Sequence, residues 1–247
     1  MGVAVTAAAP AKAEPAAPPP VAEVTAVLPA DEGDLSHNLQ GQRLGRKGRD
    51  TRERILLATT RLLYCDRRDV PISMSAVARE ASLGMTSLYN YFKDLPELLG
   101  AVLEGVMASA EEAYLAPLRR HWHDGELAER CYEFVRGYQD FWEKHSHLLH
   151  LRNALSDKAD PVMTRHRIKA TQPIIGLIVE QMGGDPLAPR SRTFATATVL
   201  MIGIERSVTI STDNDLPVAM AMDIQHDIDH FLRPCARLME MAIRDMR

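Results

Sequence analysis

The stretch that decides the fold spans residues 73–94 and has the sequence SMSAVAREASLGMTSLYNYFKD. Ser73 is a favourable N-cap for a first short helix, because its hydroxyl can accept a free N–H of the first turn. Ser82-Leu83-Gly84 interrupts that helix, and a second helix is expected from Met85 to Phe92. Two short helices joined by such a turn predict a helix-turn-helix, whose second helix has the size to enter a major groove of DNA.

The second helix of this stretch has one apolar side and one polar side. Leu88 and Phe92 are four residues apart and are expected to face inward together. Short hydroxyls and an amide on the other side can reach base edges or phosphates, and tyrosine hydroxyls can hold phosphates. The residues expected to contact DNA are Arg49, Arg52, Ser73, Met85, Thr86, Ser87, Tyr89, Asn90, Tyr91 and Lys93. For Tyr89 and Tyr91, ordinary packing is the alternative.

Charge is distributed unevenly along the chain. Residues 43–68 hold nine Arg or Lys against three acidic residues, a net charge of +6, whereas the whole chain carries −4. A basic segment in a mildly acidic protein indicates a local contact with a polyanion. We expect the basic run 43–54 to follow phosphates or a minor groove as a flexible arm; a solvated linker is the alternative.

Three regions are expected along the chain. Residues 1–42 form a tail and linker rich in Ala and Pro, which cannot bury enough apolar area to fold and is expected to be disordered. Residues 43–94 form the helix-turn-helix domain, with a first helix starting at Asp50 because Asp50 and Glu53 make a capping box. Residues 95–247 form a larger helical domain.

The larger domain shows apolar residues at helical spacing and no strand alternation, so the predicted class is all-α. Asp94 and Glu97 form a second capping box, with Pro96 in the first turn of the helix that follows. Pro173 and Pro234 fall inside later helices and are expected to kink them or to shift their ends. The apolar stretches are Leu127-Cys131-Phe134-Tyr138-Trp142, Ile168-Thr171-Ile175-Ile178-Met182, Phe194-Ala197-Met201-Ile204-Val208 and Ile224-Ile228-Phe231-Cys235-Leu238-Ala242.

Eight short motifs in residues 51–98 form a pattern that is typical of one family. They are Thr51-Arg52-Glu53, Val77-Ala78, Ala81, Leu83, Leu88-Tyr89, Tyr91, Phe92 and Glu97-Leu98. In these residues the chain resembles the DNA-binding region of TetR-family transcription regulators. Ser82 stands where the family usually has Gly, at a turn that is expected to need positive φ, and Leu95 stands where the family usually has a phosphate-binding Lys.

The resemblance implies a cytoplasmic repressor that is released from a near-palindromic operator by a small molecule. It also implies a homodimer formed through the last two helices, at residues 191–210 and 219–246. The residues that would line an effector pocket, or else form only core, are Met107, Phe134, Tyr138, Trp142 and His150. Glu205-Arg206, inside an apolar stretch, is expected to be an interface pair or a pocket pair.

Other functional classes find little support in the sequence. Three distant cysteines give neither a disulfide framework nor a metal motif, and the longest uncharged apolar stretch, 194–204, is too short to cross a bilayer. Neither a metal nor another cofactor is expected, because HSHLLH (145–150) and HWH (121–123) lack the spacing of ligands on one helix face and are better explained as surface or pocket histidines. Two alternatives stay open: a helical metal-dependent enzyme, and a DNA-binding activator or architectural protein without an effector.

Overall fold

The computed structural model describes residues 43–64, 71–213 and 228–247, and within these ranges it contains helices and no β-strand. The predicted all-α class is confirmed. The tail at 1–42 and residues 219–227 of the expected dimer segment lie outside the described residues. The helices are α2 (Arg46–Tyr64), α3 (Met74–Glu80), α4 (Met85–Tyr89), α5 (Leu95–Ala108), the π-helix η1 (Glu111–Leu115), α6 (Ala116–Leu118), α7 (Leu127–Lys144), α8 (Ser146–Asp157), α9 (Pro161–Gln181), α10 (Arg192–Ser211) and α12 (Asp229–Met246).

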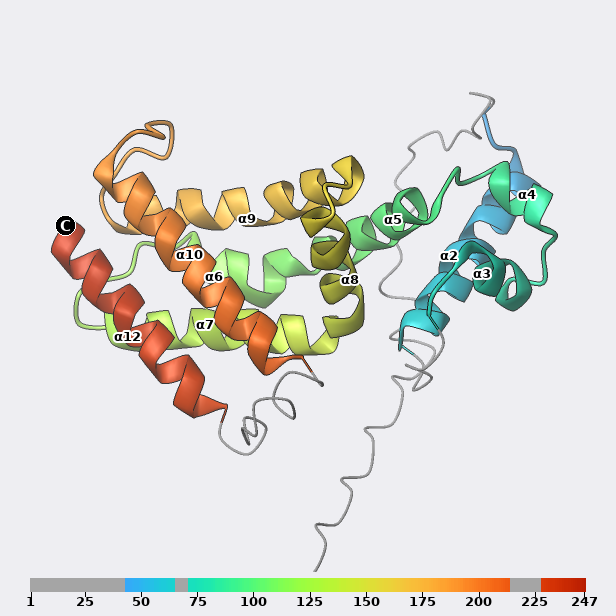
Figure 1. The fold of residues 1–247 in the computed structure, drawn as a ribbon. Coiled ribbons are helices and arrows are strands. Elements are labelled where there is room, and N and C mark those ends of the chain that lie inside the picture. Colours follow the sequence, from blue (N-terminus) through green and yellow to red (C-terminus); the bar gives the residue numbers. More distant parts are fainter. Residues whose placement is uncertain (1–42, 65–70, 214–227) are drawn as a thin grey trace, which may run out of the picture.

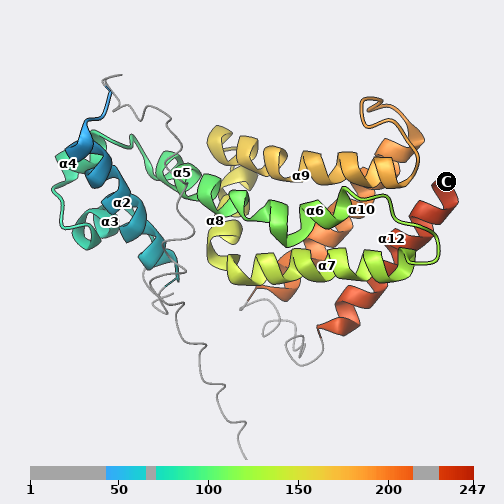
Figure 2. The ribbon, with the colours of Figure 1, turned by 180° about the vertical axis from the view of Figure 1, so that it is seen from behind.

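The helices form a small group and a large group that are joined by α5 (Figures 1 and 2). Helices α2, α3 and α4 make up the small group at one end, and the helices from α6 to α12 make up the large group. Helix α5 packs against α2 on one side and against α8 and α9 on the other. One hydrophobic core, extending from Ile55 to Ile243 along the chain, runs through both groups.

Helix α2 begins earlier than the sequence predicted. Its first residue is Arg46, and the N–H of Arg49 already donates to the carbonyl of Gly45 at 3.0 Å. The start predicted at Asp50 is therefore wrong, because Asp50 lies in the second turn, where backbone N–H groups have helical partners. Leu44, just before the helix, is buried and anchors this earlier start. The basic residues 46–49 consequently belong to a helix and not to a flexible arm.

The turn between α3 and α4 follows the prediction, whereas α4 is shorter than expected. The Ser73 hydroxyl accepts the N–H of Ala76 at 3.2 Å, so Ser73 is the N-cap of α3. Ser82 has φ = 53°, the left-handed conformation that favours glycine. Helix α4 ends at Tyr89 and not at Phe92, although the N–H of Phe92 still donates to the Leu88 carbonyl at 3.2 Å.

The start of α5 is also confirmed. Asp94 Oδ1 accepts the N–H of Glu97 at 2.9 Å, and Glu97 Oε2 accepts the N–H of Lys93 at 2.7 Å. Leu95 is half-buried and packs on the core, so this position offers an apolar contact and no cation.

In the large group, the apolar stretch of α7 is buried throughout, as predicted. The prediction for the apolar stretch on α9 is correct only in part, because Ile168 at its start is 49% exposed. Pro173 and Pro234 lie inside α9 and α12, and neither helix ends there.

We predict that Ser82→Gly stabilises the protein. The left-handed backbone at Ser82 costs roughly 1 kcal/mol for a residue with a Cβ, and glycine removes that cost. Urea unfolding should show a gain of that order. Ser82→Ala is the matched control, because alanine keeps the Cβ; equal stabilities of the two variants would contradict the explanation.

Candidate functional site

Helix α4 presents an exposed polar surface that is anchored from behind. Leu88 is fully buried and Phe92 is 2% exposed, so the inward register predicted from the sequence is confirmed. Tyr91 is half-buried and packs on the core, which makes it mainly a packing residue. The exposed residues are Met85, Thr86, Ser87, Tyr89, Asn90 and Lys93.

The basic N-terminal end of α2 lies beside α4 (Figures 1 and 2). The Arg52 guanidinium lies 5.4 Å from the centre of the Phe92 ring and so connects the two segments. Arg43, Arg46, Lys47 and Arg49 are exposed in the same region. Ser73, by contrast, is half-buried and its hydroxyl oxygen is used as the cap of α3. The structure thus brings most of the expected DNA contacts together at one end of the molecule.

Two histidines, His145 and His147, join the end of α2 to the large group. The sequence analysis did not predict this histidine joint. His145 is buried and its Nδ1 shares a hydrogen bond with the Tyr64 hydroxyl; the two rings meet edge to face at 5.8 Å. The carbonyl of Leu63 accepts a hydrogen bond from Nδ1 of His147 at 3.1 Å. Burial, with a smaller effect from Lys144, lowers the pKa of His145 to about 4, so its imidazole is neutral. The expectation that His145 is a surface or pocket residue is therefore wrong.

The residues expected to line an effector pocket lie in or next to an aromatic core. Phe134 and Tyr138 stack at 6.2 Å, and the His150 ring meets the Trp142 ring edge to face at 5.8 Å. Tyr114, which the sequence analysis did not single out, contacts Phe134 and Tyr138. Met107 is half-buried on α5, at the edge of the same core. Phe134, Tyr138 and Trp142 are almost completely buried, as core side chains are.

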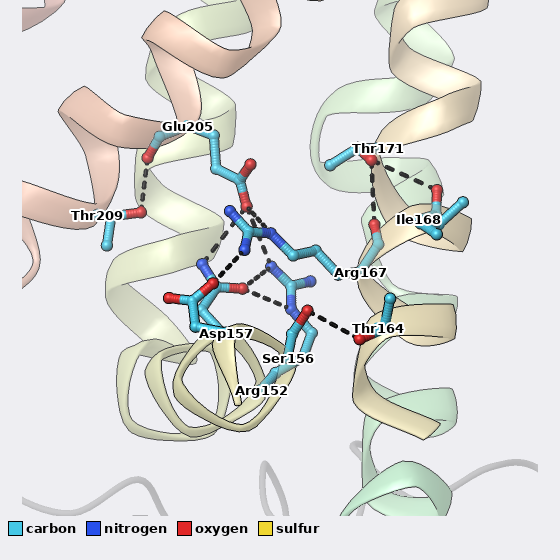
Figure 3. A network of polar contacts seen from close by, with 10 residues as sticks. Arg152, Ser156, Asp157, Thr164, Arg167, Ile168, Thr171, Glu205 and Thr209 are labelled. Carbon is cyan, nitrogen blue, oxygen red and sulfur yellow. Dashed lines mark hydrogen bonds and ion pairs between the residues drawn. The ribbon is translucent and has the colours of Figure 1, made fainter. Parts of the chain in front are cut away.

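Beside these rings lies a polar cluster formed by Arg152, Asn153, Asp157, Arg167 and Glu205. Figure 3 shows its four charged side chains. Glu205 Oε1 lies 3.5 Å from Nη2 of Arg152 and 3.4 Å from Nε of Arg167. The Arg167 guanidinium also pairs with Asp157 at 3.0 Å. Helices α8, α9 and α10 are thus connected through one carboxylate, and the partners of Glu205 are these arginines.

Arg152 is the most deeply buried member of this polar cluster. Its side chain is 3% exposed, and its guanidinium lies 5.4 Å from the centre of the Trp142 ring. Burial lowers the pKa of the Arg152 guanidinium, and the nearby Tyr138 and Glu205 oppose that shift. Burial raises the pKa of Tyr138 above its usual value, so its hydroxyl stays protonated. Arg206, next in sequence to Glu205, is exposed and does not share its surroundings.

An open groove of about 890 Å³ lies between α10 and α12, away from the residues expected to line a pocket. It is lined by Val199, Leu200, Gly203, Ile204, Ser207, Cys235, Leu238, Met241, Ala242, Arg244 and Asp245. Several apolar side chains here are more than half exposed, including Val199 at 69% and Leu238 at 58%. Within the described ranges, α10 is also the one helix long and apolar enough to cross a membrane by length and composition, with 28% of its apolar window buried.

Comparison with models of known protein families gives no match for this chain, and no curated protein matches its sequence. In the part of the chain that the structure describes, no three His, Cys, Asp or Glu side chains come together as a metal site would need.

We predict that His145 makes stability depend on pH. Its pKa is about 4 in the folded protein and 6.5 when exposed, so its contribution is complete above pH 6.5 and falls as the pH drops from 6.5 towards 4. The loss over this range is about 3 kcal/mol. Urea unfolding across these pH values should show a steeper loss for the native sequence than for His145→Gln.

Tyr64→Phe is the matched control for the joint. It removes the hydroxyl that is hydrogen-bonded to His145 and keeps the ring, so it should lower the free energy of unfolding by about 1–3 kcal/mol at every pH at which His145 is neutral. Identical pH profiles for the native protein and His145→Gln would show that His145 does not cause the dependence.

Proposed function

We propose that this protein is a homodimeric, sequence-specific DNA-binding regulator of transcription, most simply a repressor released by a small molecule. The observation that carries the proposal is the exposed surface of α4. Thr86, Ser87 and Asn90 offer hydroxyls and an amide to solvent, while Leu88 and Phe92 fix the helix from behind. Side chains of this kind, held on a rigid short helix, suit a major groove.

Charge around α4 supports a nucleic-acid partner. Arg43, Arg46, Lys47 and Arg49 are exposed at the adjacent end of α2, and Lys93 follows α4. Cations gathered on either side of a reading surface supply the contacts to phosphate that position a protein on a duplex. The resemblance of residues 51–98 to TetR-family regulators points the same way.

The groove between α10 and α12 supports a symmetric dimer. Exposed apolar side chains on both helices form one continuous surface, which a second copy of the same surface would cover. Helix α10 fits a lipid environment less well, because Arg206 is exposed within it and a cation is costly in a bilayer core. A dimer also places two α4 helices for two half-sites of an operator.

The two alternatives predict different results. A metal-dependent enzyme requires ligands that the described residues do not bring together, and stoichiometric metal in the purified protein would favour it. An activator or architectural protein without an effector would bind DNA with an affinity that no small molecule changes.

The deciding experiment is selection of binding sites from random duplex DNA, followed by affinity measurements at several salt concentrations. We expect a near-palindromic consensus and an affinity that falls steeply with salt. If no sequence is enriched, the proposed function is wrong.

Arg49→Gln should weaken binding to every sequence to a similar degree. It removes an exposed cation from the end of α2, so the slope of log affinity against log salt should decrease by about 1. The matched control is Arg165→Gln, which removes an exposed arginine from α9 in the large group. An equal effect of both variants would indicate that Arg49 acts only through net charge.

Leu238→Lys should convert the dimer to a monomer, because it places a charge in the apolar groove between α10 and α12. Sedimentation equilibrium measures the mass in solution. Ile168→Lys is the matched control, since Ile168 on α9 is similarly exposed and does not line the groove. A dimeric Leu238→Lys protein would exclude this surface as the interface.

A further inference from the structure

The polar cluster around Arg152 holds two guanidiniums and two carboxylates of unequal burial. Arg152 and Glu205 are 3% and 8% exposed at their side chains, and Arg167 is 34% exposed. Asp157, the second carboxylate, is 70% exposed and lies at the solvent edge. Glu205 is thus the one buried carboxylate that faces both guanidiniums, and the charge of Arg167 is balanced by a carboxylate that is largely solvated.

The ion pairs of Glu205 in the polar cluster are also long. Glu205 uses a single oxygen, Oε1, for Arg152, Arg167 and Asn153, at 3.4–3.5 Å. Charge-assisted hydrogen bonds are typically about 2.7–2.9 Å. The hydrogen bonds of Arg152 go instead to the neutral amide oxygen of Asn153, at 3.0 and 3.1 Å. A buried pair held so loosely offsets little of its desolvation cost, which makes a purely stabilising role a poor explanation.

One edge of the polar cluster is open to solvent. Asp157 and Arg167 lie at this edge, whereas Arg152 is buried and its guanidinium lies against the Trp142 ring. Figure 3 shows the side chains of Arg152, Asp157 and Arg167 close together. The hydroxyls of Ser156 and Thr164, 3.3 Å apart, lie beside the guanidiniums and can donate to a further oxygen. An anion arriving from solvent would meet Arg167 first and Arg152 next.

We propose that this polar cluster binds the carboxylate of a small monoanionic effector, which replaces Asp157 on Arg167 and contacts Arg152. With Asp157 displaced into solvent, one bound carboxylate balances the charges of Arg152, Arg167 and Glu205, whereas a phosphate dianion would leave a net charge of −1. The planar carboxylate also matches the paired N–H groups of a guanidinium. This inference rests on the proposed function, since it names the chemical class of the regulating molecule.

Binding to the polar cluster would alter the contacts that connect three helices. Glu205 belongs to α10, which lines the proposed dimer groove, and Arg152 belongs to α8, which packs against α2 and α5. A ligand that changes the pairing of Arg152 and Arg167 therefore acts on helices that contact both the small group and the groove. Such a ligand can change the affinity for DNA only by as much as it prefers one arrangement of these helices over another.

The test measures binding of four acids of increasing apolar size to the full chain, in the absence of DNA and at constant ionic strength. The acids are acetate, butyrate, benzoate and indole-3-acetate, and their neutral amides and inorganic phosphate serve as comparisons. We expect thermal stabilisation by at least one of the acids, and none by the amides or by phosphate. Calorimetry then gives the Kd of the acid that stabilises most.

Variants at the solvent edge of the polar cluster separate recognition from folding. Arg167→Gln should raise the Kd by about tenfold or more, because it removes a charged hydrogen-bond donor. Asp157→Asn should lower the Kd, since it removes the competing carboxylate. Arg130→Gln, on α7, should leave the Kd unchanged. Circular dichroism verifies that each variant is folded.

The inference is wrong if none of the four acids stabilises the protein, if the amides act as well as the acids, or if Arg167→Gln binds like the native protein. Stronger stabilisation by phosphate would assign the polar cluster to dianions and would also overturn it. Enrichment of a DNA site without any acid effect would reject this inference and leave the proposed function standing. Acid binding without DNA enrichment would reject the proposed function.

Discussion

The position of α5 is the constraint on which the rest of the structure depends. Leu98, Leu99, Leu103 and Val106 are fully buried on this helix, and Val102 is 1% exposed, so they form a broad apolar face. Buried Gly100, Ala101 and Gly105 extend the covered surface beyond that face, while Glu104 remains exposed. A helix buried on so much of its surface must pack against neighbours on more than one side. Helix α2 covers it from the small group, and α8 and α9 cover it from the large group. Because interiors are close-packed, neither group can shift without repacking this shared helix.

The histidine joint and the polar cluster meet the same helix, α8, at its two ends. The joint lies at residues 145–147, where α8 begins, and Arg152 and Asp157 lie in its second half. Helices α5 and α9 also approach each other closely. A Cβ added at Gly100 of α5 would come within 3.0 Å of Nε2 of His166 on α9. Glycine therefore permits the close approach of α5 and α9. These contacts give the small group and the interior of the large group a continuous set of packed elements.

The sequence predicted well what depends on local rules. Ser73 and Asp94 cap their helices as their side chains allow, and Leu88 and Phe92 take the inward register that their spacing requires. The start of α2 was missed because the helix extends beyond its apparent capping box at Asp50, with Leu44 buried against Gly48 of the first turn. A capping pattern in the sequence does not show that a helix begins before it.

The candidate sites also differ in how far local sequence patterns predict them. The exposed surface of α4 follows from periodicity alone, whereas the pairing of Glu205 with Arg152 and Arg167 spans residues 152–205 and depends on how α8, α9 and α10 pack. His145 was misjudged for a related reason. Its partner, Tyr64, is 81 residues away in sequence, and no spacing rule relates the two positions.

The place of Trp142 gives the protein an internal optical signal. The chain holds two tryptophans, and both are buried. Trp122 donates its indole N–H to the Pro117 carbonyl near the far end of the large group, whereas Trp142 stacks under Arg152 and touches His150. A guanidinium and an imidazole against an indole ring affect its excited state, so the emission of Trp142 senses how the charges beside it are arranged. In a protein whose Trp122 is replaced by Phe, rearrangement of the polar cluster can be followed by fluorescence in real time, without any attached dye.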